Sequence, residues 1–286
     1  AFSFAMQAGA RPGETLQHAF YCGLPPTTDE IRQALAANED IDFRELANVK
    51  DADGQYVVAD LAASILAKDG VIGLFQGSAE TGPRALGHRS ILANPCNPKT
   101  LENINRLVKF REPIRPLAPM ATLEAALKYF ELNEGASDDS YNAYNYMVLT
   151  ARAKALTRKE LPAIVHHDGT SRVQIVREEQ DPFCHALLKA MGRHLGAEVS
   201  VNTSLNVGAP IAQSPQDAID TMKRAAALTA LLMIGDSGES FLVWHTQQTP
   251  PKDGGARLLN WYAEWQSQTG RTDNDTKMVA ISGDHH

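Results

Sequence analysis

The sequence predicts an α/β fold, in which a β-sheet is covered by helices. Short apolar runs rich in strand-forming residues alternate with longer segments whose apolar residues recur at helical spacing. Polar motifs follow several predicted strands, and α/β sheets place their ligands at strand ends. The chain has 286 residues, enough to bury a sizeable core as one large domain or two smaller ones.

The first half of the chain contains clear helix and strand signals. Thr27 or Thr28 can cap a helix that places Ile31 and Leu35 on one face. Residues 57–69 are amphipathic and end at an Asp-Gly pair. Further helices are expected over residues 99–108 and 121–130, and strands over 71–75 and 90–93.

The second half continues the alternation. Pro182 to Leu195 predicts a helix, which Gly196 can terminate. Pro215 opens another helix, and Arg-Val-Gln-Ile-Val at 172–176 alternates as a half-buried strand does. Further strands are expected over residues 146–149, 199–201 and 231–235.

The chain divides into three predicted parts. Residues 1–50 are interpreted as a connector and the tail of a missing upstream domain, because they begin abruptly with apolar residues and continue with Gly, Pro and Thr. Residues 51–247 form the predicted α/β domain. Residues 248–286 are a polar C-terminal extension that we expect to be partly disordered.

Composition excludes several classes of protein. The formal net charge of −7 argues against nonspecific nucleic-acid binding, which depends on neutralising phosphates. The three cysteines form no CxxC pair, which favours a reducing cytoplasm. No apolar run approaches the roughly 18 residues of a membrane span, so no membrane partner is expected.

Two short runs place basic side chains among glycines and prolines. The first, residues 77–90, contains Arg84 and Arg89; the second, residues 108–119, contains Lys109, Arg111 and Arg115. Prolines hold such loops in fixed shapes, and guanidinium groups bind phosphate or carboxylate through two hydrogen bonds. The runs therefore favour an oxyanion site, although a tight turn with a surface arginine is an open alternative for the first.

Two other polar segments have alternative readings. His166, His167 and Asp168 resemble metal ligands, but adjacent side chains of an extended chain point apart, so a metal site is disfavoured. Residues 202–206, Asn-Thr-Ser-Leu-Asn, follow a predicted strand. Their hydroxyl and amide groups can donate to phosphate or hold magnesium through water, or form an ordinary Asx or Ser turn.

The motifs GPRALGHRSILANP, VKFREPIRPLAP, HHDGTSRVQ and VNTSLN resemble the O-carbamoyltransferases of nodulation-factor and antibiotic biosynthesis, over roughly residues 10–245. The resemblance implies the C-terminal part of such an enzyme. That part is a twisted mixed sheet flanked by helices, like threonylcarbamoyl-adenylate synthase (YrdC-like). It is expected to make carbamoyl-adenylate from carbamoyl phosphate and ATP with Mg²⁺, for transfer by a separate N-terminal domain that is missing here.

The resemblance also implies site residues. Lys109 and Arg115 are the expected catalytic residues, which neutralise the phosphate of carbamoyl phosphate and later the ATP triphosphate. Ser78 and Thr81 stand where the family usually carries Arg and Phe. This departure keeps a second hypothesis open, a degenerate module that binds nucleotide or carbamoyl phosphate and regulates a partner. The expected ligands of the phosphates are Arg84, Lys109, Arg115, Arg172, Asn202, Ser204 and Asn206.

Overall fold

Two β-sheets and the helices around them make up the part of the chain that the structure, a computed structural model, describes: residues 20–46, 50, 54, 56–82, 84–137, 143–248 and 252–271. The larger sheet has eight strands in the order β1-β11-β10-β2-β3-β9-β4-β8. Its strands are β1 (Ile41–Leu46), β2 (Ile72–Phe75), β3 (Arg89–Ala93), β4 (Ala118–Ala121), β8 (Gln174–Ile175), β9 (Val199–Ser204), β10 (Ala230–Ile234) and β11 (Ser240–His245).

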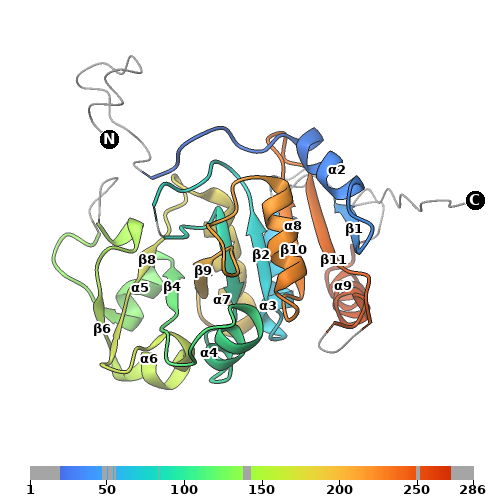
Figure 1. Ribbon diagram of the computed structural model, residues 1–286. Coiled ribbons are helices and arrows are strands. Elements are labelled where there is room, and N and C mark those ends of the chain that lie inside the picture. Colours follow the sequence, from blue (N-terminus) through green and yellow to red (C-terminus); the bar gives the residue numbers. More distant parts are fainter. Residues whose placement is uncertain are drawn as a thin grey trace, which may run out of the picture.

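The larger sheet is mixed. β2 and β10 are parallel, as are β4 and β8, while the remaining neighbours are antiparallel. A smaller sheet, β5-β6-β7, lies at the left of Figure 1. Its strands are β5 (Phe130–Glu131), β6 (Ala151–Ala153) and β7 (Thr170–Ser171).

Helices cover both faces of the larger sheet (Figure 1). α3 (Val57–Ala67) packs against α7 (Pro182–Leu195) and α9 (Ala256–Thr269), and these helices share one hydrophobic cluster with the sheet. α2 (Thr28–Ala36) and α8 (Pro215–Arg224) belong to the other cluster. Neighbouring residues of β2 separate the two clusters: Leu74 belongs to the first and Phe75 to the second. This alternation is what a strand buried on both faces requires.

Short helices complete the fold. α5 (Leu123–Tyr129) and α6 (Ala155–Glu160) lie beside the smaller sheet in Figure 1. α4 (Thr100–Asn103) continues into a π-helical turn, η1 (Ile104–Val108). Two 3₁₀ turns are η2 (Ala143–Tyr146) and η3 (Pro162–Ile164). No helix within the described ranges is long and apolar enough to cross a membrane.

The expected mixed α/β sheet flanked by helices is confirmed, and most predicted elements lie where expected. The strand predicted at 146–149 is wrong: η2 occupies residues 143–146, and Met147 has a φ of 55°, which a strand does not accommodate. The predicted strand at 199–201 extends to Ser204.

The predicted division at residue 51 differs from the arrangement of the sheet. β1, placed in the connector, is the edge strand of the larger sheet, and α2 packs on α8. Of the predicted C-terminal extension, α9 packs on α3 through Leu258, Tyr262 and Trp265. The expected upstream helix tail at residues 1–9 and most of the expected disordered tail lie outside the described residues.

Candidate anion-binding site

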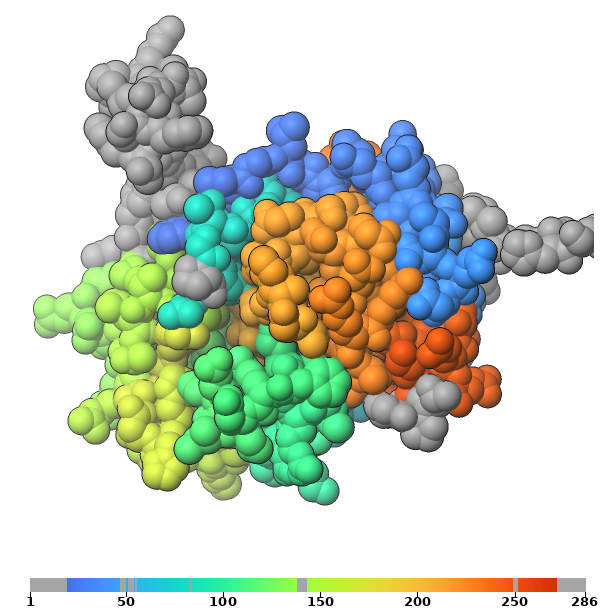
Figure 2. All heavy atoms as spheres, viewed as in Figure 1, coloured from blue at the N-terminus to red at the C-terminus, as the bar shows by residue number. Residues whose placement is uncertain are grey.

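Strand direction brings the basic motifs to one edge of the larger sheet. β3 and β4 both run antiparallel to β9, and β8 runs parallel to β4. The beginnings of β3, β4 and β8 therefore meet the end of β9. Arg84 precedes β3, Arg115 precedes β4 and Arg172 precedes β8, while Ser204 ends β9. In Figure 2 the segment around residue 210 borders the segments around residues 80 and 105.

The loop that carries Arg84 is closed by a buried carboxylate. Glu80 Oε1 accepts hydrogen bonds from the backbone N–H groups of Leu86, His88 and Arg89, at 2.9, 2.8 and 3.0 Å. Gly87 has a φ of 110°, and a Cβ there would lie 2.8 Å from Cys184 Sγ. The loop therefore requires glycine at this position for both its backbone angle and its close contact.

Arg89, which sequence reasoning grouped with the basic motif, is internal to the loop. It is buried, and its guanidinium donates to the carbonyl oxygens of Gln76, Gly77 and His88. Burial lowers the pKa of Arg89 to about 10, an effect that the nearby Glu80 opposes. Arg89 thus holds the loop together, and Arg84 is the exposed cation that the loop presents.

Arg84 and Arg172 lie close enough to repel each other. Burial first, and then the charge of Arg84, lowers the pKa of Arg172. Burial also lowers the pKa of His166, an effect to which Arg172 adds and which Asp168 opposes. Two like charges held together at the end of a sheet favour the binding of an anion between them.

Lys109 lies against the end of β9. The π-helical turn η1 places it there, with the Lys109 N–H donating to Ile104 O at 2.8 Å. Its ammonium contacts four oxygens, Ser204 O at 2.7 Å, Ser204 Oγ at 3.3 Å, Asn206 O at 2.8 Å and Asn206 Oδ1 at 2.6 Å. Burial, followed by the charge of Arg111, lowers the pKa of Lys109 to about 7.

The segment between Lys109 and Arg115 is organised by Asn105. This side chain is 0% exposed. It donates to Pro113 O and Arg115 O at 3.0 and 2.8 Å, and its oxygen accepts from Arg111 Nε at 2.7 Å. The side chain of Arg115 itself is 57% exposed, with Glu112 at 3.9 Å.

The remaining predicted ligand, Asn202, is directed into the sheet. It is 1% exposed, and its Nδ2 donates to Ala85 O at 3.1 Å and to Gln174 Oε1 at 2.8 Å. Both amide hydrogens are therefore committed, and its carbonyl oxygen is an acceptor that phosphate oxygens do not bind. The role of Asn202 as a direct phosphate ligand stays a prediction; in this structure its side chain supports the Arg84 loop.

Sequence reasoning missed three residues that build this edge: Glu80, Asn105 and Gln174. Glu80 lies in the first basic run, where a single carboxylate does not indicate which backbone groups it will bind. Asn105 lies in a helix where an amide gives no distinctive signal, and Gln174 was expected on the polar face of a half-buried strand. Glu80 and Asn105 bind backbone groups six to ten residues away, and Gln174 binds Leu86 O, 88 residues away; no periodic pattern in the sequence marks these pairings.

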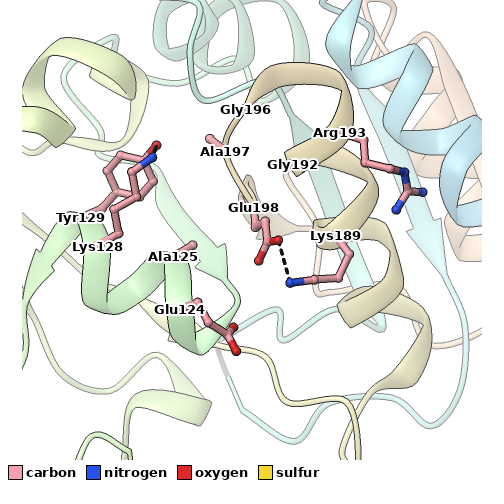
Figure 3. A pocket seen from close by; sticks show the side chains of 10 residues that line it. All are labelled: Glu124, Ala125, Lys128, Tyr129, Lys189, Gly192, Arg193, Gly196, Ala197 and Glu198. Carbon is pink, nitrogen blue, oxygen red and sulfur yellow. Dashed lines mark hydrogen bonds and ion pairs between the residues drawn. The ribbon is translucent and has the colours of Figure 1, made fainter.

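A separate cavity of about 450 Å³ lies between α5 and α7 (Figure 3). It is near Glu198, which precedes β9, so it lies at the opposite end of that strand from Ser204. Lys189 contacts Glu198 at 2.7 Å across it. Arg193 points away toward Asp60, at 2.8 Å. These charges are already paired within the protein, and the cavity is distinct from the basic edge.

A family comparison matches the basic edge and the sheet that carries it. The sequence model of the family described as "Carbamoyltransferase C-terminus" matches residues 63–237, which include all four basic and polar motifs. The chain belongs to this carbamoyltransferase C-terminus family. Membership does not by itself assign the reaction, because relatives are much longer than the chain.

Two relatives of this carbamoyltransferase family illustrate the match. Nodulation protein NolO of Bradyrhizobium diazoefficiens is 41% identical over 165 residues, which cover 57% of this chain and 29% of the relative. The 3'-hydroxymethylcephem-O-carbamoyltransferase of Amycolatopsis lactamdurans is 38% identical over 147 residues, which cover 51% of this chain and 26% of the relative. The aligned part is thus about a quarter of each relative's length.

Among solved structures, HypF of T. kodakarensis is similar over 70% of this chain and 25% of that chain, with 16% identity and a TM-score of 0.44. A full-length HypF is similar over 81% of this chain and 34% of the HypF chain, with 12% identity and a TM-score of 0.43. These scores are too low to carry an argument about fold or ligand. The likeness to threonylcarbamoyl-adenylate synthase therefore stays a prediction.

Proposed function

We propose that this chain forms carbamoyl-adenylate from carbamoyl phosphate and ATP, and that the acceptor is carbamoylated by a separate domain of the kind that its longer relatives contain. The observation that carries the proposal is the convergence of the four motifs at one sheet edge within a carbamoyltransferase family. A basic edge of this kind suits substrates that bear phosphates.

The proposed reaction has two steps. Hydrolysis of carbamoyl phosphate gives carbamate and inorganic phosphate. A carbamate oxygen then attacks the α-phosphorus of ATP, forming the new O–P bond as the bond to pyrophosphate breaks. Negative charge accumulates on phosphate oxygens in both steps, so fixed cations lower both barriers.

The residues divide into two groups in this proposal. Arg84 and Arg172, whose charges already repel, bind one phosphate group between them. Lys109 and Arg115 bind a second phosphate group, and Ser204 and Asn206 hold Lys109 at the end of β9. Asn202 supports the Arg84 loop.

The donors at this edge do not suit a magnesium ion held by the protein alone. The side-chain oxygens of Ser204 and Asn206 accept from Lys109, and a cation there would compete with the ammonium. Within the described ranges, no group of three or more His, Cys, Asp or Glu is arranged to hold a metal. These residues do not fit a protein-held magnesium site, so any magnesium would enter as part of the ATP complex.

Isotope exchange between pyrophosphate and ATP tests the proposal directly. The chain is incubated with ATP, magnesium and radioactive pyrophosphate, with and without carbamoyl phosphate. We expect exchange that requires carbamoyl phosphate and that falls in Arg84→Ala and Arg172→Ala. Absence of exchange from a folded chain would overturn the proposal.

Two observations favour the second candidate, a regulatory module that binds ATP or carbamoyl phosphate without reaction. The ammonium of Lys109 is already surrounded by protein oxygens, and Ser78 donates to Gly23 O at 2.9 Å where the family usually has Arg. Calorimetric binding of ATP without any pyrophosphate exchange supports this module, whereas exchange eliminates it. In either case we expect no carbamoylated sugar from this chain alone.

A further inference from the structure

A buried amide connects the two segments that present Arg84 and Arg172. Gln174 is the first residue of β8 and is 3% exposed. Its Nε2 donates to Leu86 O at 2.8 Å, and its Oε1 accepts from Asn202 Nδ2 at 2.8 Å. The same Asn202 nitrogen donates to Ala85 O at 3.1 Å. Two buried amides thus hold consecutive carbonyl groups of the Arg84 loop.

The hydrogen bond from Gln174 to Leu86 lies near both arginines along the chain. Gln174 is two residues beyond Arg172, and Leu86 is two residues beyond Arg84. The bond from Gln174 to Leu86 O therefore joins the two arginine-bearing segments close to their charges. Arg84 lowers the pKa of Arg172 in addition to the effect of burial, so the cations repel and the segments need a restraint.

An amide is suited to this restraint because one end donates and the other accepts. Gln174 must donate to a carbonyl and accept from an amide N–H at the same time. A carboxylate supplies only acceptors, and a thioether supplies neither group. Leu86 O also accepts from Tyr21 Oη at 2.9 Å, so the loop keeps one partner when Gln174 is replaced. The loop can then fold while its position relative to β8 is less well fixed.

We propose that Gln174 is a positioning residue that sets the spacing of Arg84 and Arg172, with Asn202 orienting its amide. The inference rests on the proposed function, because it concerns the same phosphate site. It assigns Gln174 no contact with substrate: the residue acts through the two arginines. It also gives the buried Asn202 a role that its two committed amide hydrogens allow.

The test measures steady-state formation of pyrophosphate by Gln174→Met, with KM and kcat determined separately for ATP and carbamoyl phosphate. Methionine has a similar length but makes neither hydrogen bond. We expect KM for one or both substrates to rise about tenfold, while kcat changes less than threefold. Ser200→Ala is the matched control, since this buried β9 hydroxyl donates to Ala93 O at 3.3 Å, away from the basic edge. Its KM should equal that of the wild type.

A double-mutant cycle separates positioning from general destabilisation. If Gln174 acts through Arg84, then Gln174→Met added to Arg84→Ala should raise KM less than twofold further. Additive effects would overturn the inference, because they indicate independent roles. Should the methionine variant fail to fold, Gln174→Glu keeps the shape and the acceptor for Asn202, and it replaces the donor to Leu86 O by a charged carboxylate oxygen. A folded Gln174→Glu or Gln174→Met with wild-type KM also overturns it.

The outcomes distinguish this inference from the proposed function. Unchanged KM in Arg84→Ala and Arg172→Ala would refute the phosphate site itself. Raised KM in both arginine variants, together with wild-type KM in a folded Gln174 variant, would refute only the positioning role.

Discussion

Lys109 is the residue whose removal tests the site most directly. Its ammonium is half-buried, and the four oxygens that it contacts belong to the neutral residues Ser204 and Asn206. Loss of a charge-assisted contact to a bound anion costs about 1.5–3 kcal/mol. We therefore expect Lys109→Ala to lose roughly tenfold to hundredfold in carbamoyl-phosphate-dependent pyrophosphate release. Subsaturating carbamoyl phosphate makes the loss visible.

Arg106→Ala is the control for this variant, because Arg106 is exposed on η1 and pairs with Glu102 at 2.6 Å. Its turnover should match the wild type. Lys109→Arg should restore little activity, since a planar guanidinium does not reproduce four contacts to a compact ammonium. Equal turnover of Lys109→Ala and the wild type would remove Lys109 from the proposed site.

The same residue predicts a pH dependence of ATP binding. The pKa of Lys109 is lowered to about 7, so the free protein loses this positive charge as pH rises above 7. A bound anion favours the charged form, and binding above pH 7 must therefore take up a proton. We expect the Kd for ATP to increase from pH 7 to pH 9, by at most about tenfold per pH unit. Isothermal calorimetry at pH 7, 8 and 9 measures it.

Lys109→Arg provides the comparison for the pH series, because arginine stays charged throughout this range. Its Kd should be nearly independent of pH between 7 and 9. A wild-type Kd that is equally flat would contradict the assignment of the charge loss to Lys109.

At the scale of single elements, η1 and its buried Asn105 fix the loop that carries Arg111 and Arg115. The Asn105 side chain makes three hydrogen bonds to this loop. Leaving buried partners unsatisfied costs about 1–3 kcal/mol, so we expect Asn105→Ala to lower the free energy of unfolding by about that amount. Urea denaturation measures the change.

Asn103→Ala is the control for Asn105→Ala, because Asn103 is also an asparagine but ends α4 and is exposed. Its free energy of unfolding should change by less than about 0.5 kcal/mol, as is usual for surface positions. If the two alanine variants were equally stable, the hydrogen bonds of Asn105 would not hold the loop.

The observed helices and strands also show which elements can be predicted from the sequence. Helices α2, α3 and α7 were predictable because caps and helical periodicity are local signals. The 104–108 segment was predicted as helix, but its π-helical form was not, because it depends on the Lys109 N–H reaching Ile104 O. β4 was missed because Pro116 and Pro119 suggested a loop, whereas Pro119 lies within the strand opposite Val201.

The cations of the proposed site can be selected from the sequence, whereas the residues that support them cannot. Arg84, Lys109, Arg115 and Arg172 belong to motifs that a sequence displays directly. Gln174 and Asn105 are ordinary amides whose partners are carbonyl groups of other segments, and no local pattern marks them. Asn202 was identified within its motif, but its inward direction follows from its pairing in β9 between β3 and β4.

On the scale of the whole molecule, the residues that match the family model do not include every strand of the larger sheet. Residues 63–237 omit β1 and β11, and β11 covers β10, whose five residues are all buried. We expect a fragment of residues 63–237 to aggregate or to unfold without cooperativity, because its apolar edge strand is uncovered. A chain of residues 20–271 should unfold cooperatively. Size-exclusion chromatography and thermal denaturation compare the two, and a monomeric, cooperative short fragment would contradict the expectation.

The pairing of β1 with β11, in which Ile41 lies opposite His245, also has a consequence for biosynthesis. A ribosome releases β1 early, but its neighbour in the sheet is synthesised almost at the end of the described chain. Until then β2 also lacks β10, and apolar strands remain uncovered on the nascent polypeptide. The sheet can therefore be completed only after the residues up to His245 have left the ribosome, and until then the growing chain is a natural client for chaperones that bind exposed apolar segments.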